Sequence, residues 1–152
     1  MKILVVKTSS LGDVIHALPA LTDAAHAIPN ISFDWVVEKS FSEIPSWHLQ
    51  VNKVIPVSWR KWRKNMRESW KSGEIQHFYH DLRDSHYDKI IDAQGLMKSA
   101  IMACMAKGIK CGLDYKSARE PLASLFYQHR HKVDYQQHAV TRSRQLFAKA
   151  LG

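Results

Sequence analysis

Short apolar segments alternate with longer segments of helical periodicity along the chain, and this alternation decides the expected fold. Residues 2–7 (KILVVK) are rich in β-branched side chains, which is typical of a buried parallel strand. Further strands are expected at 31–39, 53–58, 87–95 and 110–114. Helices are expected at 14–28, 41–49, 59–84, 96–108, 119–130 and 138–152. Strands that alternate with helices predict a Rossmann-like α/β domain, a parallel sheet with helices on both faces.

Proline and glycine positions refine the expected boundaries. Pro19 lies inside the first expected helix and should kink it or mark a break near its first turn. Gly73 should interrupt the helical segment 59–84. Pro121 suits the first turn of the helix at 119–130.

Length and composition indicate one soluble domain over residues 1–152. Apolar residues make up 45% of the chain, and no apolar run approaches the roughly 18 residues that cross a bilayer. The first apolar run is too short for a secretory signal, so we expect the chain in the cytoplasm. Cys104 and Cys111 lack the spacing of a zinc site, and no pair of the nine histidines comes with a third ligand. No metal site is therefore expected.

The charge balance narrows the class of ligand. Lys and Arg total 22 against 14 Asp and Glu, a net charge of +8. Such an excess attracts nucleic acid, anionic lipid headgroups or phosphorylated substrates. Charge alone does not choose among these three.

One basic segment, residues 59–71, concentrates this charge. If the segment is one helix, a single face carries five cations: Arg60, Arg63, Lys64, Arg67 and Lys71. Tryptophans and Met66 lie on the neighbouring face, as in a helix at a membrane interface or one that binds a substrate with an apolar body and an anionic head. The alternative is a helix packed by its tryptophans with a solvated basic side. The mutual repulsion of five cations favours an anion-binding role.

In parallel sheets, ligands bind beyond the carboxyl ends of the strands, which directs attention to the loops at 8–13, 58–60 and 92–98. In the first loop, Ser9, Ser10 and Gly12 leave backbone N–H groups open to an anionic ligand at the start of a helix. Asp13 follows, where its carboxylate could accept a proton from a substrate hydroxyl. The alternative is that Ser10 and Asp13 form a capping box. The loop lacks both the dinucleotide fingerprint and the phosphate-gripping loop.

Two further cations stand near expected helix starts. Lys98 falls in the first turn of the helix at 96–108, and Arg119 directly precedes Glu120-Pro121. A cation at a helix N-terminus is disfavoured by the helix dipole, so each side chain either points to solvent or pairs with a bound anion.

Six blocks of sequence resemble the heptosyltransferases of lipopolysaccharide synthesis, a family of inverting GT-B glycosyltransferases, and among them the type I members. The blocks are VKTSSLGDVIHALPALTDA (6–24), FDWVVE (33–38), IPSWH (44–48), VIPV (54–57), IDAQGLMKSA (91–100) and AREPLASLFY (118–127). The resemblance implies transfer of L-glycero-D-manno-heptose from ADP-heptose to the first Kdo of Kdo2-lipid A, without a metal ion or other cofactor. It places the reaction at the cytoplasmic face of the inner membrane.

The resemblance also assigns roles to residues. Asp13 matches the general base of the family, within the substrate-binding loop that holds Ser9, Ser10 and Gly12. Arg60, Arg63 and Lys64 match the basic helix implicated in holding the acceptor's phosphates and carboxylates, and position 61 has Lys where relatives often have Arg. Arg119 and Lys98 match further acceptor-side cations.

Family members have roughly twice the length of this chain, so the resemblance identifies the N-terminal, acceptor-binding half of a GT-B fold. Nothing in residues 1–152 corresponds to the C-terminal domain that binds ADP-heptose, and we expect negligible transferase activity from the chain alone. The competing hypothesis is a non-catalytic basic module that binds anionic membrane lipids or nucleic acid through residues 59–71. The resemblance favours the enzyme half, with no nucleic-acid partner.

Overall fold

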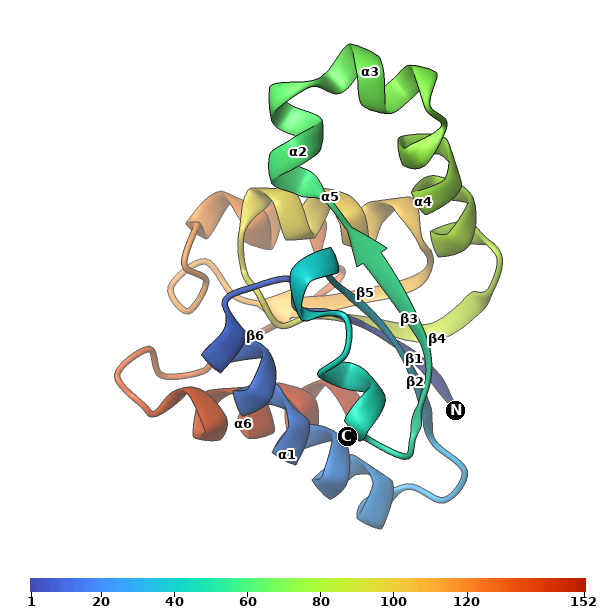
Figure 1. Cartoon of the computed structure of the whole chain (residues 1–152). Coiled ribbons are helices and arrows are strands. Elements are labelled where there is room, and N and C mark those ends of the chain that lie inside the picture. The colour runs from blue at the N-terminus through green and yellow to red at the C-terminus, as the bar shows by residue number, and fades with distance from the viewer.

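In the computed structural model, which describes residues 1–152, six parallel strands form one sheet (Figure 1). The strands are β1 (Lys2–Val6), β2 (Ser32–Glu38), β3 (Val51–Val57), β4 (His86–Asp92), β5 (Lys107–Leu113) and β6 (His129–His131). Their order across the sheet is β3-β2-β1-β4-β5-β6, and every neighbouring pair is parallel. All carboxyl ends therefore lie along one edge, and the predicted α/β class is confirmed.

Helices cover both faces of this sheet. They are α1 (Leu11–Ala27), α2 (Trp59–Lys64), α3 (Met66–Lys71), α4 (Glu74–Arg83), α5 (Met97–Met105) and α6 (Ala139–Leu151). The 3-10 turns are η1 (Lys39–Phe41), η2 (Pro45–Trp47) and η3 (Pro121–Phe126). Helices α1 and α6 lie side by side on one face, and α4 and α5 lie on the other (Figure 1). None of the helices has the length and hydropathy of a membrane span.

The central strand β1 shows why the sheet needs two covering layers. Ile3 and Val5 enter the core beneath α1 and α6, whereas Leu4 and Val6 enter the core beneath α4 and α5. All four side chains are fully buried. Side chains alternate between the faces of a strand, so an unbroken apolar run is stable only where both faces are covered.

The segment 59–84 corrects a prediction. We expected one helical stretch interrupted at Gly73, but the chain breaks at Asn65 as well and forms three helices, α2, α3 and α4. These helices make an arch above α5 (Figure 1). Folding back brings the Trp62 and Phe78 rings into edge-to-face contact, with centroids 5.3 Å apart, which one straight helix would not allow. The five cations therefore do not share one helical stripe.

Three other expectations also change. The segment 119–130 was expected to be a helix, but it holds the 3-10 turn η3 and the start of the strand β6. The residues of β6 (HRH) form a short polar edge strand, so the sequence gives no apolar signal for it. The segment 41–49 is not a continuous helix: it contains the last residue of η1 and the short turn η2. Helix α1 begins at Leu11 and continues past Pro19, so of the two expected effects of this proline, a kink or a break, the break does not occur.

Candidate active site

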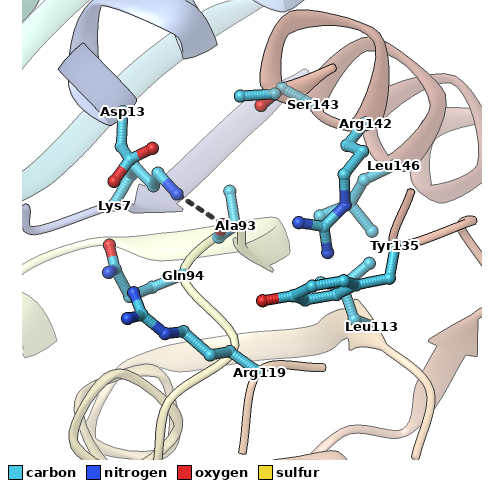
Figure 2. Close-up of a pocket in the computed structure, with 11 residues that line it drawn as sticks. Lys7, Asp13, Ala93, Gln94, Leu113, Arg119, Tyr135, Arg142, Ser143 and Leu146 are labelled. Carbon is cyan, nitrogen blue, oxygen red and sulfur yellow. Dashed lines mark hydrogen bonds between the residues drawn. The ribbon is translucent and has the colours of Figure 1, made fainter. Parts of the chain in front are cut away.

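A pocket of about 180 Å³ lies at the carboxyl edge of the sheet, and we call it the Asp13 pocket. Its polar side chains come from six different segments: Lys7 after β1, Asp13 in α1, Gln94 after β4, Arg119 after β5, Tyr135 after β6, and Arg142 and Ser143 in α6. Figure 2 shows these side chains around one space. Because the strands are parallel, residues far apart in the sequence meet at this edge.

Asp13 both caps its helix and borders the pocket. The backbone N–H and the Oγ–H of Ser10 donate to Asp13 Oδ2 over 3.2 and 3.0 Å. Oδ1 has no hydrogen-bond partner in the chain. The capping and catalytic interpretations are therefore compatible, because one oxygen fixes the side chain and the other is available to a ligand.

The surroundings of Asp13 favour its ionised form. Partial burial opposes ionisation, but the hydrogen bonds from Ser10 and the nearby Lys7 ammonium outweigh it and hold the pKa of Asp13 below its ordinary value. Lys7 Nζ donates to the Ala93 carbonyl over 3.1 Å, which fixes the ammonium on the pocket wall (Figure 2). Burial lowers the pKa of Lys7, although the carboxylates of Asp13 and Asp92 act in the opposite direction.

The opposite side of the pocket is rich in donors. Figure 2 shows the guanidinium groups of Arg119 and Arg142 and the Tyr135 hydroxyl directed toward the space that Asp13 and Gln94 also border. Arg142 lies over the Tyr135 ring, 4.5 Å from its centroid, and donates from Nη2 to the Ser117 carbonyl over 3.0 Å. Arg142 Nε is buried without a partner. The cations Lys7, Arg119 and Arg142 thus lie around the Asp13 carboxylate. The cations suit an anionic ligand, and the carboxylate suits a hydroxyl group on that ligand.

Gln94 joins the first loop to the pocket. Its Oε1 accepts hydrogen bonds from the backbone N–H groups of Thr8 and Ser9 over 3.2 and 3.4 Å. The Gln94 amide nitrogen makes no hydrogen bond within the chain and remains available as a donor. Gln94 thus positions the loop that leads to Asp13 and also offers a donor to a ligand.

A buried carboxylate, Asp92, holds the loop after β4 in place. It accepts hydrogen bonds from the backbone N–H groups of Gln94 and Gly95, from Ser99 Oγ at 2.8 Å and from the Tyr127 hydroxyl at 2.5 Å. Burial raises the pKa of Asp92, and these donors oppose the shift. Gly95 has φ +68°, a left-handed conformation that favours glycine.

The structure brings only some of the sequence-predicted residues together. Asp13 and Arg119 share the pocket, and Ser9 and Ser10 support the loop through the hydrogen bonds described above. Gly12 is exposed in the first turn of α1. No group of three or more His, Cys, Asp or Glu side chains in the structure could hold a metal ion.

The remaining predicted cations lie outside the Asp13 pocket. Arg60, Arg63 and Lys64 are exposed on α2, and Lys98 is half-buried in the first turn of α5. Lys98 and Arg60 both come near Glu38 at the carboxyl end of β2. Burial raises the pKa of the Glu38 carboxyl, and these two cations oppose the shift.

Nine of the eleven lining residues were not predicted as site residues, and five of the nine have polar side chains: Lys7, Gln94, Tyr135, Arg142 and Ser143. Lys7 directly follows β1, a position that would have nominated it, and Gln94 lies in the nominated loop 92–98, although it was not singled out there. Tyr135 and Arg142 follow β6, and the sequence gives no apolar signal for that strand.

Residues 75–152 match the family model of glycosyltransferase family 9 (heptosyltransferase). The chain belongs to glycosyltransferase family 9. The resemblance drawn from the six sequence blocks is therefore confirmed at the level of the family.

Curated relatives of this family 9 chain extend the likeness over residues beyond the family match. The chain is 56% identical to lipopolysaccharide heptosyltransferase 1 of Escherichia coli (strain K12), over 100% of the chain and 48% of the relative. It is 59% identical to lipopolysaccharide heptosyltransferase 1 of Pseudomonas aeruginosa (strain PAO1), over 99% of the chain and 43% of the relative. The chain spans about half the length of the curated relatives that it matches.

Solved structures also match the chain over less than half of their own length. The E. coli heptosyltransferase WaaC with ADP-2-deoxy-2-fluoro heptose is 56% identical, with a TM-score of 0.96 over 99% of the chain and 48% of that structure. The E. coli ADP-heptose lps heptosyltransferase II is 21% identical, with a TM-score of 0.73 over 97% of the chain and 40% of that structure. The second likeness supports the fold alone.

Proposed function

We propose that this chain is the acceptor-binding half of a heptosyltransferase, which transfers L-glycero-D-manno-heptose from ADP-heptose to the first Kdo of Kdo2-lipid A. The observation that carries the proposal is Asp13, whose carboxylate has one free oxygen in a pocket that is also lined by Lys7, Arg119 and Arg142. The relatives named lipopolysaccharide heptosyltransferase 1 and the solved relative with an ADP-heptose analogue support the substrate class.

Asp13 acts as the general base in this proposal. Its lowered pKa keeps the carboxylate ionised at neutral pH, so Oδ1 can accept the proton of the attacking Kdo hydroxyl. The hydroxyl oxygen bonds to the anomeric carbon of the heptose from the face opposite ADP. As this bond forms, the bond between that carbon and the phosphate oxygen breaks with its electron pair on the departing ADP, which inverts the anomeric configuration.

The cations of the pocket hold the acceptor. Lys7, Arg119 and Arg142 lie around Asp13 and suit the carboxylate of a Kdo sugar, since a guanidinium can bind a carboxylate through two parallel hydrogen bonds. Ser9, Ser10 and Gly12 form the loop against which the sugar rests. Arg60, Arg63, Lys64 and Lys98, farther along the same edge of the sheet, take the more distant anionic groups of the acceptor.

The donor site belongs to sequence that lies outside residues 1–152. The full-length relatives are about twice as long, and in a GT-B enzyme the active site lies in the cleft between two domains. We therefore propose that ADP-heptose reaches Asp13 from a C-terminal domain, and that residues 1–152 alone turn over negligibly. The acceptor lipid places the reaction at the cytoplasmic face of the inner membrane.

The test joins this chain to the part of the E. coli relative that it does not match, and follows heptose transfer to Kdo2-lipid A by mass spectrometry. Asp13→Asn should lower kcat by about 10²–10⁴-fold, the range for loss of a general base. Its Kd for the acceptor should change less than about twofold, because the cations remain. Glu43→Gln, which neutralises an exposed carboxylate outside the pocket, is the matched control and should leave both values unchanged. Full turnover by Asp13→Asn would overturn the proposed role.

A basic module for nucleic acid or anionic lipids remains the second candidate, and the five unpaired cations of the arch favour it. None of Arg60, Arg63, Lys64, Arg67 and Lys71 forms an ion pair. Titration of the chain with duplex DNA and with Kdo2-lipid A at equal salt separates the two candidates. Tighter binding to DNA than to the acceptor would contradict the heptosyltransferase proposal.

A further inference from the structure

A second and larger cavity lies inside the arch, outside the Asp13 pocket. Its volume is about 530 Å³, and nine of its twelve lining residues are hydrophobic. Trp62 and Phe78 form a buried wall, and Met102 and Met105 of α5 lie at its base. We call this space the arch cavity. Its size and lining are those of a site for an apolar ligand.

The arch cavity opens to solvent between apolar side chains. Met66 and Trp70 both line it, and they are 64% and 59% exposed. Exposed apolar side chains around a hollow usually mark a binding surface, because their exposure to water costs free energy that a ligand recovers. Methionine at three lining positions adds side chains that adapt to a ligand of irregular shape.

The charges around the cavity decide which apolar ligand fits. Arg60, Arg63, Lys64, Arg67 and Lys71 are exposed on α2 and α3, and none of them forms an ion pair. Arg63 also lines the cavity itself. An apolar space beside unpaired cations is complementary to a molecule with a hydrocarbon chain and an anionic head.

A second copy of the chain fits this surface poorly. The chain carries a net charge of +8, and two copies that met at the arch would bring their unpaired cations together. The acidic side chains of the arch do not remove this repulsion, since Glu74 already pairs with Lys61 at 2.7 Å and Glu68, the one acidic residue of α2 and α3, is outnumbered by the five unpaired cations. Charge complementarity therefore favours an anionic lipid over self-association.

We propose that the arch cavity binds one acyl chain of an anionic phospholipid from the membrane surface, while Arg67 and Lys71 of α3 hold the phosphate. This lipid site lies apart from the Asp13 pocket and involves none of the residues that line that pocket. It would fix the chain to the membrane whether or not the transferase proposal is correct.

The test uses a lipid without any sugar acceptor, so that its failure is distinct from failure of the proposed transferase. A single-chain lysophosphatidylglycerol, kept below its critical micelle concentration, is titrated into the chain by calorimetry. Saturable binding at one lipid per chain is expected. Lysophosphatidylcholine, which has no net charge, should bind at least about 20-fold more weakly, since each cation near a lipid phosphate contributes about fivefold.

Variants locate the site. Met66→Gln with Trp70→Gln should weaken lysophosphatidylglycerol binding at least about tenfold, because the opening becomes polar. Trp47→Gln with Leu49→Gln, which alters two exposed apolar side chains outside the cavity, should leave binding unchanged. Met105→Trp tests the same cavity by filling it, and should also weaken binding.

Charge variants complete the test. Arg67→Gln and Lys71→Gln should each weaken binding about fivefold. Equal binding of the charged and uncharged lipids would overturn the assignment of the phosphate. Binding to vesicles alone, with none to monomeric lipid, would show adsorption on the surface and overturn the cavity site. A dimer in light scattering that Met66→Gln with Trp70→Gln dissociates would show that a second copy covers the arch, which also overturns the proposal.

Discussion

The Asp13 pocket and the arch cavity use basic side chains in different ways. In the Asp13 pocket, Lys7 and Gln94 follow strands and Arg142 lies in α6, and each is fixed by a hydrogen bond with a backbone group of another segment. Five exposed cations of α2 and α3 make no ion pair, although their neighbour Lys61 pairs with Glu74; the five are Arg60, Arg63, Lys64, Arg67 and Lys71. The pocket is therefore preorganised for a small polar group, whereas the arch suits a larger and less specific anion.

The largest expected effect comes from Asp92, on which the rigidity of the Asp13 pocket depends. Asp92→Ala should lower the free energy of unfolding by about 3–5 kcal/mol, because it leaves the Ser99 and Tyr127 hydroxyls and two backbone N–H groups without their buried acceptor. Urea unfolding followed by circular dichroism measures the loss. Asp84→Ala removes an exposed carboxylate and should change stability little. A small effect of Asp92→Ala would mean that the loop is held by other contacts.

Arg119 tests whether the pocket recognises the acceptor more specifically than the arch does. Arg119→Gln should weaken binding of a soluble Kdo disaccharide about tenfold, since a charge-assisted hydrogen bond to a carboxylate is lost. Lys107→Gln, at the opposite edge of the sheet, is the control for net charge. Equal losses for the two variants, measured by calorimetry, would show that only the overall charge matters.

Glu74 tests the mobility of the arch. It accepts hydrogen bonds from Lys61 Nζ over 2.7 Å and Trp62 Nε1 over 3.0 Å, and so joins α2 to α4. Glu74→Gln should speed amide hydrogen exchange several-fold in residues 59–73, without changing exchange in the strands. Glu68→Gln, an exposed neighbour without an ion pair, is the control. Unchanged exchange in the arch would show that its apolar contacts alone hold it.

The same two regions show what sequence reasoning reaches. Asp13 could be predicted because strand alternation places the loop after β1 at the carboxyl edge of the sheet, and this depends only on local periodicity. Arg119 was nominated instead by its place before Glu120-Pro121 and by the family resemblance, and it lies in the same pocket. The break at Gly73 was predicted, but the arch was not, because it also needs the break at Asn65 and the packing of Trp62 against Phe78, a tertiary contact that local pattern does not show. Arg142 was missed because it follows the short polar strand β6. Local pattern thus identifies strand ends well and tertiary folding of short helices poorly.

The smallest expected effect concerns the ionisation of Asp13 in its pocket. Ser10→Ala removes the hydrogen bond from Ser10 Oγ, which is one of the interactions that lower the pKa of Asp13, so that pKa should rise toward its ordinary value. The present interaction stabilises the fold at pH values above the unfolded-state pKa, and the stabilisation is lost as the pH falls through the lower folded-state pKa. Ser10→Ala should therefore lose a little stability at neutral pH and none at strongly acidic pH, because Asp13 is then protonated in both the folded and the unfolded state. A carbon-detected NMR titration of the Asp13 carboxyl measures the shift directly, with Ser46→Ala, outside the pocket, as the control. An unchanged Asp13 titration in Ser10→Ala would assign the lowered pKa to the backbone N–H of Ser10 and the Lys7 ammonium.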